Sequence, residues 1–413
     1  MNFRLYPDKD GWLDWPLLTA TLGLMILGGL FIYSATTIHE SIGLWQRFQD
    51  ESGGAFIRYV LGQRWFVQVA AYGIGAVAAC MVCLADYHIW ARWSLVLYWA
   101  SIFLLILVLI DGIGVIRGGA RRWIDLGFFN LQPSELGKLS FILYTAHFLS
   151  RPMQELRIPS IFVKCLAMAA LPFALVFREP DLGSAMLFLP VSLAMMFVAG
   201  VPHRYLNRLM ITCAVFGGLL LANILLAPPA WRVTHEYQRE RLLVFFGLPF
   251  TLGADDEARD NATERERDKS YNVNQALLSV GSGGLFGKGW KGGNQTALGF
   301  LPRGVAHTDF IFSVIAEEKG FMGSLTVITL YGVLLFSGIK IAGQARDRLG
   351  KLLAVGVVTI LFIQVFINLG MNIRIMPVTG LPLPLLSYGG TSVVSTLIAL
   401  GILQNVYIYR KGY

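Results

Sequence analysis

Charged residues are scarce in this chain. Asp, Glu, Lys and Arg make up 15% of its 413 residues, whereas 55% are hydrophobic and the mean hydropathy is +0.58. This composition excludes a water-soluble domain, whose surface would need more charge. Helices of about 17 to 25 apolar residues can cross the hydrocarbon core of a bilayer. Ten apolar runs of about this length occur, at Trp15–Ser34, Phe66–Leu84, Trp93–Ile110, Pro133–Leu149, Ile161–Val176, Ser184–Ala199, Leu209–Leu226, Phe321–Lys340, Leu353–Met371 and Ser392–Tyr409. The sequence therefore predicts an all-α polytopic membrane protein, a single domain of ten transmembrane helices.

Cysteine and histidine are also scarce, and neither forms a ligand pattern. The four cysteines, Cys80, Cys83, Cys165 and Cys213, all lie within apolar runs, which favours packing over a disulfide framework. The six histidines show no metal-ligand spacing, so neither a metal site nor a cofactor is predicted. The net charge of +8 is not concentrated in one soluble domain, which argues against nucleic-acid binding.

Basic residues predict the orientation, because Lys and Arg are enriched in the cytoplasmic loops of membrane proteins. If both termini are cytoplasmic, every predicted inner segment is basic. These segments hold Arg4, Lys9, Arg92, Arg151, Arg157, Arg204, Arg208, the basic residues from Lys340 to Lys351, Arg410 and Lys411. The loop after the third apolar run would lie outside although it holds Arg117, Arg121 and Arg122, which suits attraction of an anionic substrate. The first run lacks a cleavage site and is predicted to be a signal anchor.

One long extracellular loop, 227–320, is predicted between the seventh and eighth transmembrane helices. Residues 231–247 have the apolar spacing of an interfacial amphipathic helix. Residues 251–270 are polar without an apolar face and are predicted to be mobile, whereas the Gly-rich and aromatic segment 271–321 is predicted to fold back and line a cavity. The prolines and glycines of 372–391 predict a second, re-entrant loop between the last two helices.

The glycine run GSGGLFGKGWKGG invites a nucleotide-binding interpretation, which its details exclude. Ser282 stands where a Walker A loop needs glycine, and Gly289 follows the lysine where Ser or Thr is needed. GKGWKG has the letters of a dinucleotide motif, but no strand precedes it. A tight loop with several positive φ angles is the better prediction.

Several charged residues near predicted helix ends have two interpretations. Glu135 and Lys138 lie on one helical face and can form a local salt bridge, or Lys138 can join Arg122 in holding a phosphate. Asp181 can cap a helix or contribute to a site with its charged neighbours. The same alternatives hold for the four residues His307, Asp309, Glu317 and Glu318. Residue types alone therefore do not decide between a transporter and a membrane enzyme that acts on a lipid phosphate.

Five ordered motifs closely resemble the shape, elongation, division and sporulation (SEDS) family, the RodA/FtsW group. They are GARRWIDLGFFNLQPSELGK, EPDLGSA, GSGGLFGKGW, HTDFIFSVIAEEKGF and GMNIRIMPVTGLPLPLLSYGGTS, and the resemblance spans the whole chain. It implies ten transmembrane helices and polymerisation of lipid II into glycan strands outside the bacterial cytoplasmic membrane. It also implies a class B penicillin-binding protein as partner. The short termini favour a RodA-like role in elongation and cell shape.

The resemblance also implies the site residues. In the family, the essential acid precedes the motif that here holds Tyr271 and Gln275, at a position six residues before the tyrosine. In this sequence that position is Arg265, and the proline and glycines of the family's motif are missing. Asp268 is the preferred catalytic acid, with Asp260 and Glu266 as reserves. The residues assigned to substrate or pyrophosphate binding are Arg122, Lys138, Glu135, Gln275, His307 and Ser387. No metal ligands are evident, although a divalent cation could share in neutralising the pyrophosphate.

Two other functions remain as alternatives. One is a lipid II flippase without covalent chemistry, which would need a polar path through the helices. The apolar runs hold few charges, and this disfavours translocation. The other is a scaffold that only activates its partner.

Overall fold

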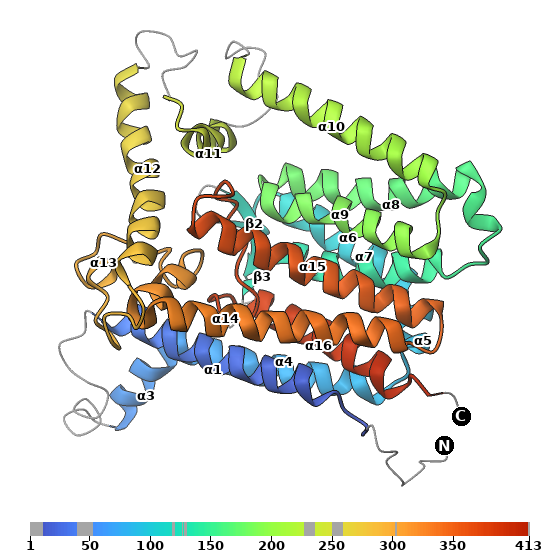
Figure 1. Cartoon of the computed structure of the whole chain (residues 1–413), viewed down its shortest axis with the longest axis horizontal. Coiled ribbons are helices and arrows are strands. Elements are labelled where there is room, and N and C mark those ends of the chain that lie inside the picture. The colour runs from blue at the N-terminus through green and yellow to red at the C-terminus, as the bar shows by residue number, and fades with distance from the viewer. Residues whose placement is uncertain are drawn as a thin grey trace.

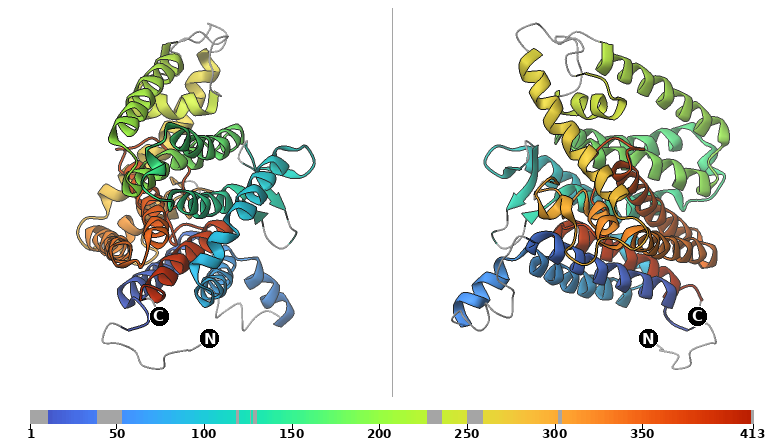
Figure 2. Two further views of the ribbon diagram at one scale, coloured as in Figure 1. Left: turned by 90° about the vertical axis from the view of Figure 1, so that its right-hand side faces the viewer. Right: turned by 60° about the vertical axis from the view of Figure 1, so that its left-hand side comes forward.

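The computed structural model describes residues 11–38, 53–117, 120–125, 127, 130–226, 236–249, 259–301 and 304–411. The long helices of the bundle run between its two ends (Figures 1 and 2). They are α1 (Trp15–Thr37), α4 (Arg64–Leu84), α6 (Ser94–Leu109), α7 (Pro133–Leu149), α8 (Pro159–Arg178), α9 (Leu182–Ala199), α10 (His203–Leu226), α14 (Ile311–Gln344), α15 (Arg348–Asn372) and α16 (Gly390–Ile408). One end carries both termini, where Arg410 donates to the carbonyl oxygen of Gly11 at 3.2 Å. It is called the terminal end below, and the other the site end.

The helical membrane fold is confirmed. Within the described residues, eight helices are long and apolar enough to span a bilayer. α6 and α7 also run between the two ends but have only 16 and 17 residues. The total of ten spans therefore stays a prediction for these two short helices.

Among the eight membrane-spanning candidates, α16 is the most buried helix, and it packs against α4. In the most apolar stretch of α16, 83% of the residues are buried within the protein, against 11% in that of α10. Helix α16 is therefore central, and α10 faces the membrane. Glycines allow α16 and α4 to approach closely. A Cβ on Gly401 would lie 2.9 Å from the Cα of Ala79, and one on Gly75 would lie 2.6 Å from Leu397. Small residues at such contacts are typical of packing between helices in membranes.

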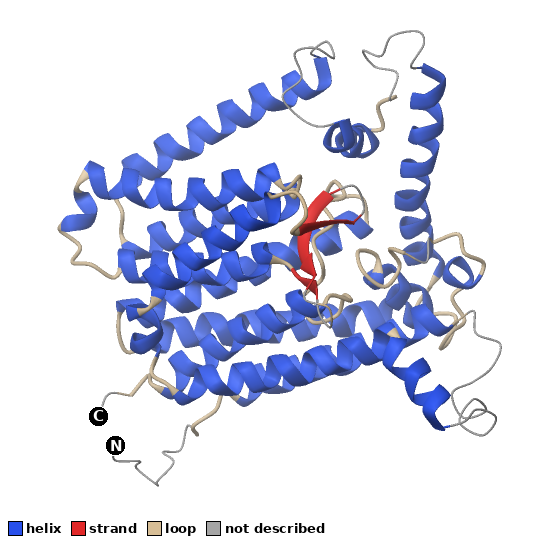
Figure 3. Cartoon of the chain, turned by 180° about the vertical axis from the view of Figure 1, so that it is seen from behind, coloured by secondary structure: helices blue, strands red, loops and turns tan. Residues whose placement is uncertain are grey.

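Short elements occupy the site end. They are α3 (Gly53–Gly62), α11 (Glu236–Phe246), α12 (Arg259–Ser282), α13 (Asn294–Ala297) and the strands β1 (Gly114–Arg117), β2 (Ala120–Asp125) and β3 (Asn130–Leu131). The strands form a small antiparallel sheet in the order β1-β2-β3, seen in red in Figure 3. The prediction of an all-α chain did not include this sheet. The terminal end carries α5 (Tyr87–Arg92) and the 3-10 turn η1 (Glu155–Arg157).

The long segment between α10 and α14 contains more helix than the sequence indicated. α11 confirms a helix within 231–247, and α12 includes 259–270, which had no apolar face to predict it. Arg374, at a φ of +60°, donates to Asn274 of α12 and to the Val244 carbonyl of α11, both at 3.3 Å. This arginine therefore ties the two helices to the loop after α15.

The glycine run is a tight loop that wraps around a break in α14. The helix was predicted to begin at Phe321 but begins at Ile311, and Gly320 interrupts it with a φ of 63° and a ψ of −155°. The amide of Phe321 donates to the Gly284 carbonyl oxygen at 2.8 Å, and the Glu317 carbonyl oxygen accepts from Lys288 at 3.0 Å. The predicted positive φ angles occur at Gly284, Gly287 and Gly289.

Gly287 should be the most sensitive glycine of this loop. Its φ is +78°, and a Cβ there would lie 2.2 Å from the Glu318 carbonyl oxygen. Gly287→Ala combines left-handed strain with overpacking against backbone, so we expect a loss of about 2 to 4 kcal/mol of stability. Thermal unfolding of the purified protein in detergent measures it. Gly281→Ala is the matched control, since its Cβ meets no atom within 4 Å; equal unfolding temperatures for the two variants would contradict the prediction.

Candidate functional site

Strand β2 carries Arg122 to the corner between α8 and α9. Its guanidinium donates to the carbonyl oxygens of Glu179, at 3.3 Å, and of Pro180. It also lies 3.8 Å from the Asp181 carboxylate, which caps α9 by accepting from the Ser184 amide at 3.1 Å. The cap predicted for Asp181 is confirmed. Arg122 and Asp181 are both largely buried, so their charges interact strongly.

Glu179 holds a protonated carboxyl group beside this pair. The side chain is fully buried, and neither carboxylate oxygen has a hydrogen-bond partner. Burial, with a contribution from Asp181, raises the pKa of Glu179 to about 9, although Arg122 lowers it. An uncharged acid avoids the cost of burying an unpaired charge. The corner therefore contains a neutral Glu179 next to the pair of Arg122 and Asp181.

A second charged pair meets at Gly380, in the loop after α15. A Cβ on Gly380 would lie 3.6 Å from two guanidinium nitrogens of Arg241 and 3.9 Å from Oδ2 of Asp309. Burial lowers the pKa of Arg241 to about 10 and raises that of Asp309 to about 6, and in each case the other residue opposes the shift. Both groups also interact electrostatically with Arg122. Three separate segments thus bring their charges to one region.

The motifs HTDF and LSYGG pair with each other. Ser387 donates to the Thr308 carbonyl oxygen, and the Tyr388 amide donates to that of His307 at 2.9 Å. The buried His307 ring lies 2.7 Å from a guanidinium nitrogen of Arg64, the first residue of α4. Two of the predicted binding residues, His307 and Ser387, are therefore neighbours.

Glu135 and Lys138 form the predicted salt bridge, at 2.8 Å, with both side chains 3% exposed. The second carboxylate oxygen of Glu135 accepts from Ser395 of α16 at 2.8 Å. The Lys138 amine is thus already paired inside the bundle. This geometry favours the structural interpretation of the pair over direct contact between Lys138 and a phosphate.

The predicted catalytic acids lie on α12, and their side chains are outside the described part of the structure. Asp260, Glu266 and Asp268 all belong to the first half of the helix, of which only the backbone course is described. Gln275 lies two turns beyond Asp268 and is partly buried. The structure consequently places these residues along one helix without relating their side chains to the arginines.

No metal centre is evident in the described residues, since no group of three or more of their His, Cys, Asp and Glu side chains is arranged to hold a metal ion. The arrangement instead offers two arginines, Arg122 and Arg241, whose charges interact with each other and with those of Asp181 and Asp309. Arginine binds phosphate oxygens through paired hydrogen bonds. The site end can therefore hold an anion.

Sequence reasoning missed Arg241 and Arg64. Residues 231–247 were interpreted only through their apolar spacing, although the charged run QRER lies within that spacing. Arg64 precedes an apolar run and was not considered. Both join the site through contacts distant in sequence, which a single sequence does not show.

Comparisons with known proteins agree with this architecture. The family model described as "Cell cycle protein", which covers FtsW, RodA and SpoVE, matches residues 16–412. Stage V sporulation protein E of Bacillus subtilis is 34% identical, covering 96% of this chain and 98% of the relative. Peptidoglycan glycosyltransferase MrdB of Escherichia coli is 33% identical, covering 98% and 97%, and the probable peptidoglycan glycosyltransferase FtsW of Geobacter metallireducens is 32% identical, covering 100% and 99%.

Solved structures have the same fold. A chain of a peptidoglycan synthase complex matches with a TM-score of 0.72 and 28% identity, covering 97% of this chain and 99% of that one. The rod shape determining protein RodA of Thermus thermophilus matches with a TM-score of 0.62 and 28% identity, covering 97% and 98%. The fold and the charged site end define a multi-pass bacterial membrane protein. This chain belongs to the FtsW/RodA/SpoVE family, as its motifs indicated.

The neutral Glu179 predicts a pH-dependent stability. Because its folded pKa of about 9 exceeds the unfolded value of 4.5, only the unfolded state ionises between these limits. The stability of the parent should fall as pH rises through this window, by at most about 1.4 kcal/mol per pH unit. Glu179→Gln should remove that slope, so its unfolding temperature should exceed the parent's increasingly from pH 5 to pH 8. Parallel curves would show that Glu179 is ionised in the folded protein.

The buried pair predicts non-additive substitutions. Lys138→Met leaves the Glu135 charge buried with Ser395 alone, and we expect a loss of about 3 to 5 kcal/mol of stability. The double variant Glu135→Gln, Lys138→Met should recover most of this loss. Thermal unfolding in detergent measures both. A Lys138→Met protein as stable as the parent but inactive would instead assign the lysine to the substrate.

Proposed function

We propose that this protein is a peptidoglycan glycosyltransferase that polymerises lipid II into glycan strands on the outer face of the cytoplasmic membrane. Relatives covering nearly the whole chain bear the name peptidoglycan glycosyltransferase. The observation that carries the proposal is the convergence of Arg122, Arg241, Asp181 and Asp309 at the site end. A lipid-linked pyrophosphate is the kind of anion that such arginines bind.

The reaction would be a displacement at a sugar carbon. The 4-hydroxyl of the acceptor's GlcNAc attacks C1 of the donor's MurNAc, the bond from C1 to the pyrophosphate breaks, and the configuration inverts. A carboxylate within about 3 Å takes the proton of the hydroxyl, and we assign this role to Asp268. Negative charge develops on the departing undecaprenyl pyrophosphate, and fixed cations stabilise that charge.

The binding residues have different roles in this proposal. Arg122 is the preferred pyrophosphate ligand, because its side chain is largely but not fully buried. Lys138 and Glu135 support the same site from inside the bundle, and His307 and Ser387 hold the two loops that border it. Gln275 lies on the helix that carries the proposed base. A divalent cation could assist, although the described residues offer no ligand set.

An apolar groove supports a lipid-linked substrate. It has a volume of about 470 Å³ and lies between α1 and α14 beside the glycine loop. Phe31 and Trp290 line it, and the Lys319 amine lies 5.7 Å from the centre of the Trp290 ring. A polyprenyl tail could lie in such a groove.

Orientation, partner and biological role follow from the same proposal. Basic residues at the terminal end support a cytoplasmic position of both termini, with the site end outside. The matched synthase complex supports a class B penicillin-binding protein as partner. Similarity to a rod shape determining protein supports a role in elongation and cell shape.

Reconstitution with purified lipid II tests the proposal. The parent, with an elongation-type class B penicillin-binding protein, should make glycan strands detectable by gel electrophoresis, whereas a division-type partner should give far less. Asp268→Asn should lower the rate at least about 100-fold, as expected for loss of a general base. Asp260→Asn is the matched control on the same helix and should retain activity, as should Glu266→Gln.

Three outcomes would contradict parts of the proposal. An inactive Asp260→Asn beside an active Asp268→Asn would reassign the base and leave the reaction intact. Translocation of labelled lipid II across liposomes without polymer would replace the enzyme with a flippase. Absence of polymer in every reconstitution, with activation of the partner, would indicate a scaffold.

A further inference from the structure

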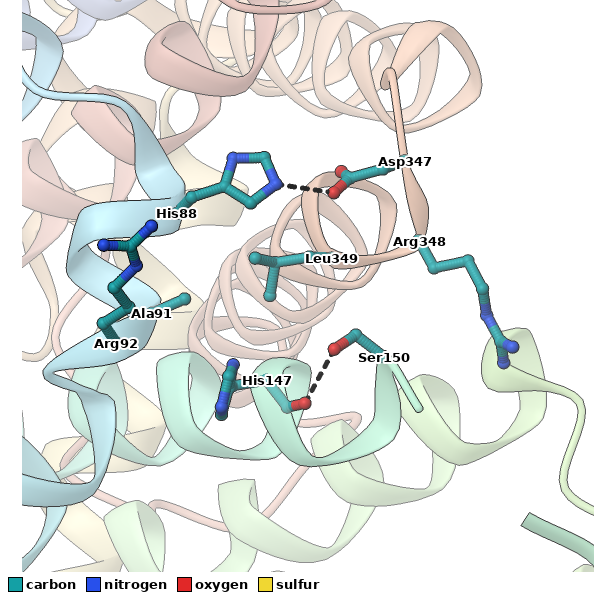
Figure 4. A pocket seen from close by; sticks show the side chains of 8 residues that line it. All are labelled: His88, Ala91, Arg92, His147, Ser150, Asp347, Arg348 and Leu349. Atoms are coloured by element: carbon teal, nitrogen blue, oxygen red, sulfur yellow. Dashed lines mark hydrogen bonds and ion pairs between the residues drawn. The ribbon is translucent and has the colours of Figure 1, made fainter. Parts of the chain in front are cut away.

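A second cavity lies at the terminal end, remote from the charged cluster described above. Its volume is about 450 Å³, and it lies between α5, the end of α7 and the turn from α14 to α15 (Figure 4). Its charged and titratable lining consists of His88, Arg92, His147, Asp347 and Arg348. Four of these five side chains are bases, so the cavity suits an anion.

The acid of this cavity is already satisfied. One oxygen of Asp347 accepts from the Gly350 amide at 2.9 Å and from the Tyr87 hydroxyl at 2.8 Å, and the other lies 2.8 Å from Nε2 of His88. Although burial would raise it, these contacts lower the pKa of Asp347. Burial would also lower the pKa of His88, but Asp86 and Asp347 together raise it. Asp347 and His88 thus form an internal ion pair and leave the other bases to a ligand.

The remaining bases come from three elements. Arg92 of α5 and His147 of α7 are exposed, and within the described residues neither side chain has a hydrogen-bond or ion-pair partner. Arg348 donates to the carbonyl oxygen of Ala199 at the end of α9, at 2.8 Å, and keeps further N–H groups for another acceptor. Arg92 and His147 are therefore the exposed bases of the cavity that an anion can reach.

Neighbouring side chains place the cavity at the depth of lipid headgroups. Trp93 follows Arg92 and is 59% exposed, and Ile89 on the same short helix is 48% exposed. Exposed tryptophans at the ends of membrane-spanning helices mark the interface between headgroups and hydrocarbon. A ligand can therefore enter from the membrane, with its headgroup beside Arg92 and its tails against apolar side chains.

We propose that this cavity binds the phosphate headgroup of an anionic phospholipid from the leaflet at the terminal end. Basic pockets between transmembrane helices on the cytoplasmic side are suited to such headgroups. The ligand is distinct from the lipid substrate at the site end, and its binding does not depend on glycosyl transfer. Free inorganic phosphate offers the same oxygens but lacks the tails that would hold it at this depth.

Native mass spectrometry of the full chain in detergent, titrated with phosphatidylglycerol or phosphatidylcholine, tests the proposal. The parent should bind phosphatidylglycerol more tightly. Arg92→Gln should weaken this binding about five-fold, and Arg92→Gln with His147→Gln should weaken it further. Arg208→Gln is the matched control, because it removes an exposed base near the same end outside the cavity, and its binding should be unchanged. Arg92, His147 and Arg208 are all exposed. Unfolding temperatures equal to the parent's would verify that the variants are folded.

Each other result would overturn the proposal. Equal affinities for the two lipids would remove the role of headgroup charge. Equal losses in Arg92→Gln and Arg208→Gln would show that only diffuse surface charge attracts the lipid. Displacement of bound phosphatidylglycerol by millimolar inorganic phosphate would assign the cavity to a soluble anion.

Discussion

The site end depends on polar side chains of spanning helices that satisfy non-helical backbone within the bundle. Asn368 of α15 donates to the carbonyl oxygens of Asp309 and Leu381, at 3.2 and 2.8 Å. Gln68 of α4 donates to the Ser387 carbonyl oxygen and accepts from the Gly389 amide, both at 3.1 Å. Unpaired backbone groups are costly away from water, so irregular chain persists at membrane depth only where such partners exist. The loops that carry His307, Asp309 and Gly380 are held in this way.

Within this scaffold, hydrogen bonds, protonation and pairing offset the cost of burying the charged groups at the site end. Two N–H groups of Arg122 donate to the carbonyl oxygens at the end of α8, where the helix dipole is negative, and so fix the corner before any substrate arrives. The other N–H groups of the guanidinium stay available to a ligand. Glu179 avoids an unpaired charge by remaining protonated. Asp309 and Arg241 face each other across Gly380, where a side chain would fill the space between them. A preorganised arrangement of this kind can stabilise developing charge without rearranging during a reaction.

Some features of this structure follow from local sequence and others do not. The apolar helical segments, the Asp181 cap and the bond between Glu135 and Lys138 depend on neighbours within four residues. Sequence reasoning predicted the apolar segments and gave the cap and the bond as one of two interpretations in each case. The break at Gly320 was missed, because its stability comes from hydrogen bonds to the glycine loop more than thirty residues earlier. Arg241 was missed for a similar reason, since only the folded chain brings it to Asp309. The role of Arg374 likewise appears only when α11 and α12 are side by side.

The position of α12 links the two halves of the proposed chemistry. Its C-terminal end continues into the glycine loop that wraps around α14, and its middle packs through Val273 against Leu243 and Val244 of α11. Arg374 adds hydrogen bonds to the same contact. A helix rises about 1.5 Å per residue, so Asp268 lies only about 7 to 8 Å along the axis from Val273. The short distance from this packed contact limits how far the proposed base can move relative to α11, which also carries Arg241. One helix pair thus couples the proposed base on α12 to a cation of the proposed anion site.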